Sequence, residues 1–138
     1  MSNIAIGIIG ARVRDSEEDF RLTELKLIEV LKELPKDSRI KLISGGCKKG
    51  GDRFAEILAS KYKIPIKIHY PDLKKANSFK YGSEENKIAF IEANYGRDLL
   101  IAKDADVLIA CVHPSRKGGT EYTIKEYLKL GKDRVFTC

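Results

Sequence analysis

The sequence predicts a three-layer α/β domain built around a parallel sheet, and two observations lead to this prediction. Short apolar runs with the character of buried strands alternate along the 138-residue chain with segments whose apolar residues recur at helical spacing. Two of the strand-like runs end directly in glycine- or serine-bearing turns, at Gly10 and at Ser44, as strands that lead into helices do. Strands that alternate with helices form right-handed βαβ units, and therefore a parallel sheet.

The chain is expected to contain five strands and four helices. The predicted strands cover residues 4–9, 40–43, 64–69, 106–112 and 134–136. The predicted helices cover residues 20–34, 54–62, 84–102 and 120–130. Ser16 is expected to cap the first helix and Pro35 to end it, whereas Gly131 should end the last one. Gly96 is expected to interrupt the third helix, and the polar residues 71–83 should form a long loop.

The strand order that we predict is 3-2-1-4-5, which makes the domain Rossmann-like. The first strand then lies at the centre of the sheet, and the order reverses between strands 1 and 4. Ligands of open α/β sheets bind in the crevice at such a reversal, outside the carboxyl ends of the strands. Residues 1–138 are expected to form a single domain, because the chain has an ordinary domain length and no linker or repeat.

Composition favours a soluble protein of the cytoplasm. No apolar run reaches the roughly 18 residues of a membrane span, and the first residues lack the pattern of a signal peptide. Cys47, Cys111 and Cys138 form no Cys-x-x-Cys motif, which favours reduced thiols over disulfides or a zinc site. We therefore expect no membrane partner, no metal and no resident cofactor.

The net charge of +6 is compatible with an anionic partner. Lysines alternate with glutamates along the predicted helices, however, which is typical of a solvated surface. Single-stranded nucleic acid stays an alternative partner, although such binding relies on aromatic stacking and the chain has 8% aromatic residues and no tryptophan. The sequence leaves open whether copies of the chain form a homo-oligomer.

Three glycine-bearing turns are predicted to meet at the carboxyl edge of the sheet. They cover residues 10–12 after the first strand, 44–52 after the second and 114–121 after the fourth. Glycine lets a phosphate or a base approach the backbone, and the free N–H groups at the start of the next helix attract anions. Any one of these turns alone is more simply a structural turn. Together they favour a site for a nucleotide or a phosphosugar.

Candidate binding residues lie in these turns and just before the fourth strand. They are Gly10, Ala11, Arg12, Ser44, Gly45, Gly46, Cys47, Gly51, Asp52, Arg97, Asp98, Gly118, Gly119, Thr120 and Glu121. Arg12 and Arg97 are each able to bind a phosphate with two N–H groups, or else to form surface contacts. Asp52 would hydrogen-bond a ribose or cap its own helix. Glu121 would steady a positively charged sugar or activate water, or would be only an acidic residue that the dipole of its helix favours in the first turn. Cys47 stands beside lysines that would lower a thiol pKa, but a small residue in a tight turn is the simpler interpretation.

The order of these motifs resembles the SLOG superfamily, which includes the Lonely Guy cytokinin-activating enzymes, the DNA-processing protein A domain and small stand-alone proteins. Residues 10–12 are similar to the Gly-Ser-Arg that ends the first strand in that family, and residues 44–55 to its Gly-Gly and Gly-Ala-Asp segments. Arg97 and Asp98 resemble its Arg-Asn segment, and residues 118–121 its Gly-Gly-Thr turn. The resemblance covers almost the whole chain and is closest to the stand-alone members. It implies a Rossmann-like fold that holds a nucleotide-derived ligand over these loops.

The resemblance also implies an enzymatic alternative. Lonely Guy enzymes cleave the N-glycosidic bond of a nucleoside monophosphate with an arginine and a glutamate near a glycine-rich turn, and the catalytic candidates here are Arg97 and Glu121. In this chain the turn is one glycine shorter, Glu121 follows Thr120 directly, and Asp98 stands where the family has asparagine. We therefore expect nucleotide binding, with phosphoribohydrolase activity as the alternative.

Overall fold

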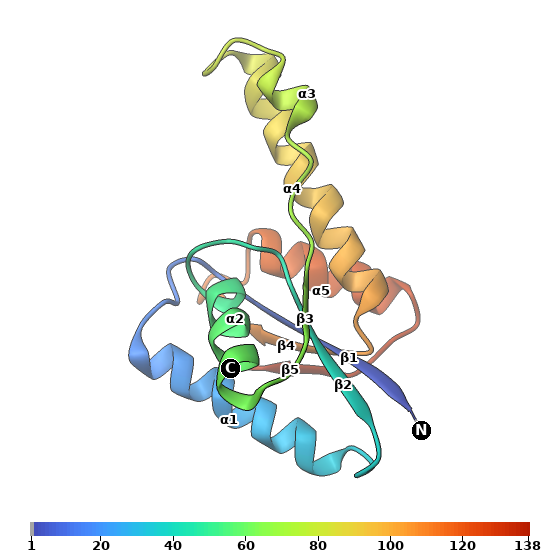
Figure 1. Ribbon diagram of the computed structural model, residues 1–138. Coiled ribbons are helices and arrows are strands. Elements are labelled where there is room, and N and C mark those ends of the chain that lie inside the picture. The colour runs from blue at the N-terminus through green and yellow to red at the C-terminus, as the bar shows by residue number, and fades with distance from the viewer. Residues whose placement is uncertain (1) are drawn as a thin grey trace.

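The parallel sheet has the strand order that the sequence predicts. A computed structural model describes residues 2–138, and its five parallel strands lie in the order β3-β2-β1-β4-β5 (Figure 1). The strands are β1 (Asn3–Gly10), β2 (Arg39–Ser44), β3 (Ile66–Ile68), β4 (Val107–Cys111) and β5 (Val135–Thr137). Strand β1 pairs with β2 along its first half and with β4 along its second half. The order therefore reverses at the carboxyl end of β1, where a ligand crevice was expected.

Helices cover both faces of the sheet. They are α1 (Glu17–Glu33), α2 (Gly51–Tyr62), α3 (Lys74–Asn77), α4 (Glu84–Asp104) and α5 (Gly119–Lys129). Ser16 caps α1 as predicted, through reciprocal bonds with Asp19, and Gly131 follows α5 with a φ of 81°. None of the helices within residues 2–138 is long and apolar enough to cross a membrane.

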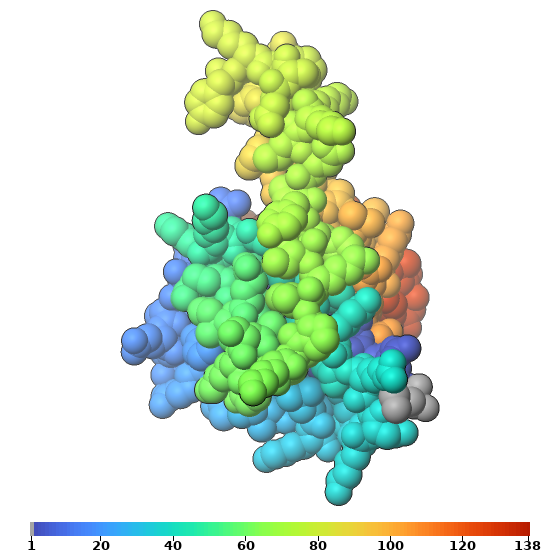
Figure 2. All heavy atoms as spheres, viewed as in Figure 1, coloured from blue at the N-terminus to red at the C-terminus, as the bar shows by residue number. Residues whose placement is uncertain are grey.

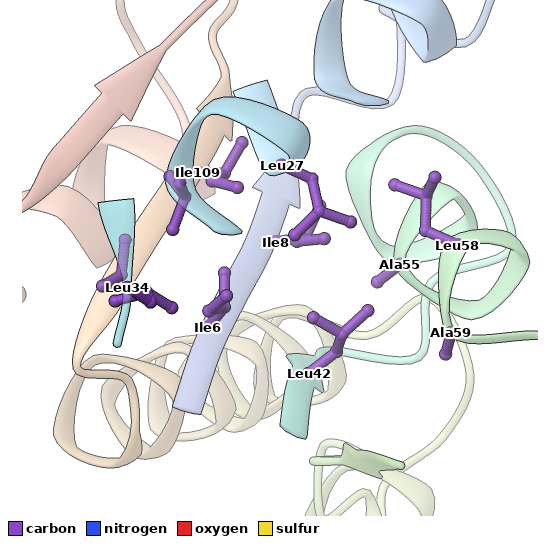
Figure 3. Packing of buried hydrophobic residues seen from close by; sticks show 11 residues of the cluster. Ile6, Ile8, Leu27, Leu34, Leu42, Ala55, Leu58, Ala59 and Ile109 are labelled. Atoms are coloured by element: carbon purple, nitrogen blue, oxygen red, sulfur yellow. The ribbon is translucent and has the colours of Figure 1, made fainter. Parts of the chain in front are cut away.

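Alternating side chains of β1 supply both halves of the core. Ile6 and Ile8 pack against α1 and α2, together with Leu42 and Ile109 of the neighbouring strands (Figure 3). Ala5 and Ile9 point to the opposite face, where α4 and α5 cover them. The period of two along a strand explains this division. Because β1 is buried on both faces, its position, and with it the place of the crevice, is fixed.

Two expectations for residues 71–104 are wrong. Helix α4 runs without interruption through Gly96, because packing of Ile101, Ala102 and Ala105 on the sheet outweighs the roughly 1 kcal/mol that a glycine costs within a helix. Residues 71–83 are not wholly a loop, since they contain α3, whose Ala76 carbonyl accepts a hydrogen bond from the Asn86 side chain of α4. Helix α3 and the first half of α4 form an arm that projects beyond the sheet (Figures 1 and 2).

Gly51, the first residue of α2, packs directly on the backbone of β1. A Cβ atom at Gly51 would lie 2.1 Å from the carbonyl carbon of Ile9 and 2.3 Å from the nitrogen of Gly10. We expect Gly51→Ala to lower the free energy of unfolding by about 3 kcal/mol, because neither backbone segment can move aside. Gly96→Ala is the matched control, since nothing lies within 4 Å of its Cβ position. It should raise stability by up to about 1 kcal/mol. Urea denaturation followed by circular dichroism measures both values, and equal effects would contradict this account of Gly51.

Candidate functional site

A cavity of about 460 Å³ opens at the carboxyl ends of β1 and β4. Its walls are the turn after β1, the middle of α4 and the segment that enters α5, and Asp52 of α2 also faces it. It therefore lies at the reversal of the strand order, where the sequence places the ligand crevice. Its volume is within the range of about 300–1,000 Å³ that is usual for small-molecule sites.

Ten of the candidate residues line this cavity and five do not. Those that line it are Gly10, Ala11, Arg12, Cys47, Asp52, Arg97, Asp98, Gly118, Gly119 and Thr120. Those outside the lining are Ser44, Gly45, Gly46, Gly51 and Glu121. The turns after β1 and β4 thus reach the cavity, whereas the turn after β2 contributes chiefly through Cys47 and Asp52.

The glycines after β2 make room for protein groups. A Cβ atom at Gly45 would lie 2.7 Å from Oδ2 of Asp52 and 2.8 Å from Nη1 of Arg97. The glycines at the start of α5 differ, because nothing lies within 4 Å of a Cβ position at Gly118, and only Oδ2 of Asp98, at 3.2 Å, lies near that of Gly119. Of these two turns, therefore, the one that enters α5 leaves space for a ligand beside its backbone.

Arg97 holds the second turn and two carboxylates together. Its Nε donates to Oδ1 of Asp98 at 2.7 Å, its Nη1 donates to the carbonyl of Gly45, and its Nη2 donates to Asn94 at 3.0 Å. Nη1 also lies 3.9 Å from Oδ2 of Asp52. We call Asp52, Arg97 and Asp98 the Asp–Arg–Asp cluster. All three guanidinium nitrogens have protein acceptors, so Arg97 is a brace at the cavity floor.

Asp52 fixes the backbone of the turn after β2. Its two carboxylate oxygens accept hydrogen bonds from the N–H groups of Gly45, at 3.1 Å, and Cys47, at 3.0 Å. Burial raises the pKa of Asp52, while these N–H groups and Arg97 act in the opposite direction. The expectation that Asp52 caps its own helix is wrong, since the N-cap of α2 is Gly50 and no side chain caps it. The carboxylate turns back to the preceding loop, where it satisfies two N–H groups.

Asp98 faces the cavity and the start of α5. The residue is 7% exposed, and its Oδ2 is the atom that lies near Gly119. Burial raises the pKa of Asp98 to about 6, Arg97 opposes this rise, and the negative charge of Asp52 adds to it. Two carboxylates share one guanidinium, so the Asp–Arg–Asp cluster carries a net negative charge when both are ionised.

Glu121 lies outside the cavity lining, in an ion pair. Arg116 donates to both of its carboxylate oxygens, from Nη2 at 3.2 Å and from Nε. The pair braces the loop that enters α5, where Arg116 adopts a φ of 56°. Of the two catalytic candidates, Glu121 is thus paired with Arg116, and Arg97 belongs to the Asp–Arg–Asp cluster.

Cationic groups and a helix start surround the mouth of the cavity. Arg12 and Lys117 are exposed, and within residues 2–138 neither side chain has a hydrogen-bond or ion-pair partner. The N-cap of α5 is Gly118, with no side-chain cap, so no side chain occupies the first N–H groups of the helix. His113 also lines the cavity, with its Nδ1 accepting a bond from the Ser115 N–H at 2.9 Å.

Sequence reasoning missed the wall that α4 provides. Phe90, Ile91 and Tyr95 line the cavity although each is at least 41% exposed, and Asn94 lies among them. A signal was available, because positions 90, 94, 97, 98 and 101 fall on one helical face. That face is apolar at both ends and polar in its middle.

Comparison of the chain with models of protein families, with curated proteins and with solved structures finds no match in any of the three.

Asp98 should make stability depend on pH in a defined direction. Its pKa in the folded state, about 6, exceeds its ordinary value of 3.8, so folding favours the protonated form. The resulting stabilisation is complete below pH 3.8 and is lost as the pH rises through 6. Asp98→Asn avoids that loss. The free energy of unfolding of Asp98→Asn, minus that of the wild type, should therefore increase by about 2 kcal/mol between about pH 4.5 and pH 7.5.

Urea denaturation at the two pH values measures this difference. Asp37→Asn is the control, because Asp37 is exposed and lies in the turn before β2. Its difference from the wild type should be the same at both pH values. An Asp98→Asn difference that did not change with pH would show that Asp98 is not protonated preferentially in the folded protein.

Proposed function

We propose that the cavity binds a nucleotide or a related phosphate-bearing small molecule, with its phosphate at the start of α5. The observation that carries this proposal is the presence of three features in one cavity. These are the uncapped N-terminus of α5, the open space beside Gly118 and the unpartnered side chains of Arg12 and Lys117.

The start of α5 suits an anion on electrostatic grounds. The first N–H groups of a helix have no partner within the helix, and the helix dipole places about half a positive charge there. One such interaction contributes only about 0.3–1 kcal/mol when exposed, so a bound phosphate needs further donors. Arg12 and Lys117 line the same cavity and supply full positive charges.

The remaining walls suit the rest of a nucleotide. Phe90, Ile91 and Val13 offer apolar and aromatic surface for a base, and Tyr95 stacks on Tyr122 with ring centroids 4.4 Å apart. The proposed ligand therefore has its phosphate at the mouth and its apolar part along α4.

The resemblance to the SLOG superfamily supports this proposal, since it implies a nucleotide-derived ligand over the same loops. The phosphoribohydrolase alternative has less support, because Glu121 is paired with Arg116 and does not line the cavity. Binding to single-stranded nucleic acid also has less support, because it relies on aromatic stacking and the chain has 8% aromatic residues and no tryptophan. Ligand binding is therefore the function that we carry forward.

A panel of nucleoside monophosphates and phosphosugars should include compounds that raise the melting temperature of the protein. A ligand at 100 times its Kd adds about 2.7 kcal/mol to stability, which corresponds to a shift of several degrees. Arg12→Ala and Lys117→Ala should each weaken binding about fivefold, which corresponds to about 1 kcal/mol. Differential scanning fluorimetry gives the shifts, and calorimetric titration gives the Kd values.

Lys36→Ala is the matched control for these two variants. It also removes an exposed positive charge, but from the turn before β2, at the opposite edge of the sheet. Its Kd should equal that of the wild type. If no compound shifts the melting temperature at millimolar concentration, or if Lys36→Ala weakens binding as much as Arg12→Ala does, the proposed site is wrong.

A further inference from the structure

The carboxylate of Asp98 lies beside the helix start at which the phosphate of the proposed ligand would bind. We propose that anion binding in this cavity is coupled to the uptake of one proton by Asp98, so that the site is sensitive to pH. This inference rests on the proposed function, because it concerns the regulation of the same site.

The geometry brings the two anions together. Oδ2 of Asp98 lies 3.2 Å from the Cβ position of Gly119, the first residue of α5. A phosphate bound by the N–H groups of that first turn would lie next to this oxygen. Oδ1 is bonded to Arg97 and is therefore held in place, so the carboxylate cannot simply turn away. Within residues 2–138, no hydrogen bond to Oδ2 is formed.

The charges around Asp98 make this encounter unfavourable while it is ionised. Arg97 of α4 is already shared with Asp52 of α2, so the Asp–Arg–Asp cluster has no positive charge to spare. Protonation of Asp98 removes one negative charge. It also converts Oδ2 from an acceptor into an O–H donor, which is able to bond a phosphate oxygen.

Other charged or titratable side chains also face this part of the cavity from each neighbouring element. They are Arg12 after β1, Cys47 after β2, and His113 and Lys117 between β4 and α5. His113 is the rival proton acceptor, although its Nδ1 already accepts a bond from Ser115. Any test must therefore separate Asp98 from His113.

Asp98 is suited to this exchange because its proton affinity is already high. Burial raises its pKa to about 6. Asp98 is therefore ionised in most molecules at neutral pH, and a small fall in pH or a small further rise of the pKa protonates it. A nearby anion raises a carboxyl pKa further. Between the pKa of the free protein and the higher pKa of the complex, binding of one anion then takes up as much as one proton.

The test uses inorganic sulfate, whose charge does not change across this range, in place of a phosphate monoester, which itself titrates near pH 6. Amide shifts of Gly118, Gly119 and Thr120, followed by NMR, give the sulfate Kd between about pH 5.5 and pH 8. The affinity of the wild type should fall about tenfold over this range, and by no more than tenfold per pH unit. Asp98→Asn should bind sulfate with no pH dependence, whereas His113→Gln should keep the dependence.

A second measurement uses the wild type alone. The ¹³C shift of the Asp98 carboxyl, titrated with and without sulfate, should show a midpoint that sulfate moves to higher pH. Sulfate binding with the same Kd at every pH, or a dependence that His113→Gln removes and Asp98→Asn keeps, would overturn the coupling and leave the proposed function standing. If no amide at the start of α5 responds at any pH, the proposed anion site and the coupling both fail.

Discussion

The guanidinium of Arg97 forms the hydrogen bonds on which the arrangement of the cavity depends. It bonds to the turn after β2, to Asn94 and to Asp98, and it lies 3.9 Å from Asp52. Buried carboxylates without a cation are strongly unfavourable, so Asp52 and Asp98 tolerate burial only while Arg97 stays between them. Asp52 in turn holds the N–H groups of Gly45 and Cys47. Through these bonds α4, α2 and the second turn behave as one unit.

This arrangement divides the carboxyl edge of the sheet into a filled side and an open side. Beside β2, Gly45 leaves room for Arg97 and Asp52, and Gly51 lets α2 rest on the backbone of β1. The N-terminus of α2 is therefore packed against protein. Beside β4, Gly118 borders open space, and no side chain caps the start of α5. Of the helix starts that follow β2 and β4, that of α5 is the one that borders open space.

The sequence was sufficient for the fold and for the place of the cavity. Apolar runs fixed the five strands, Ser16 and Gly131 marked helix ends, and the order 3-2-1-4-5 located the crevice. The role of each glycine was not predictable, because whether Gly45 makes room for a ligand or for Arg97 depends on residues 52 positions away. The uninterrupted α4 was missed for a related reason, since the packing that stabilises Gly96 within the helix is tertiary.

A carboxylate at position 98 is not needed for the brace itself. Asparagine has nearly the same shape, and its side-chain oxygen would accept the bond from Nε of Arg97 without burying a second negative charge. With aspartate at position 98, the folded protein is therefore less stable at neutral pH than asparagine there would make it. A carboxylate is able to gain and lose a proton, whereas an amide is not. Residues that lower stability without a structural need are expected at functional sites. The position of Asp98, between the brace and the open start of α5, is where such a group would act on a bound anion.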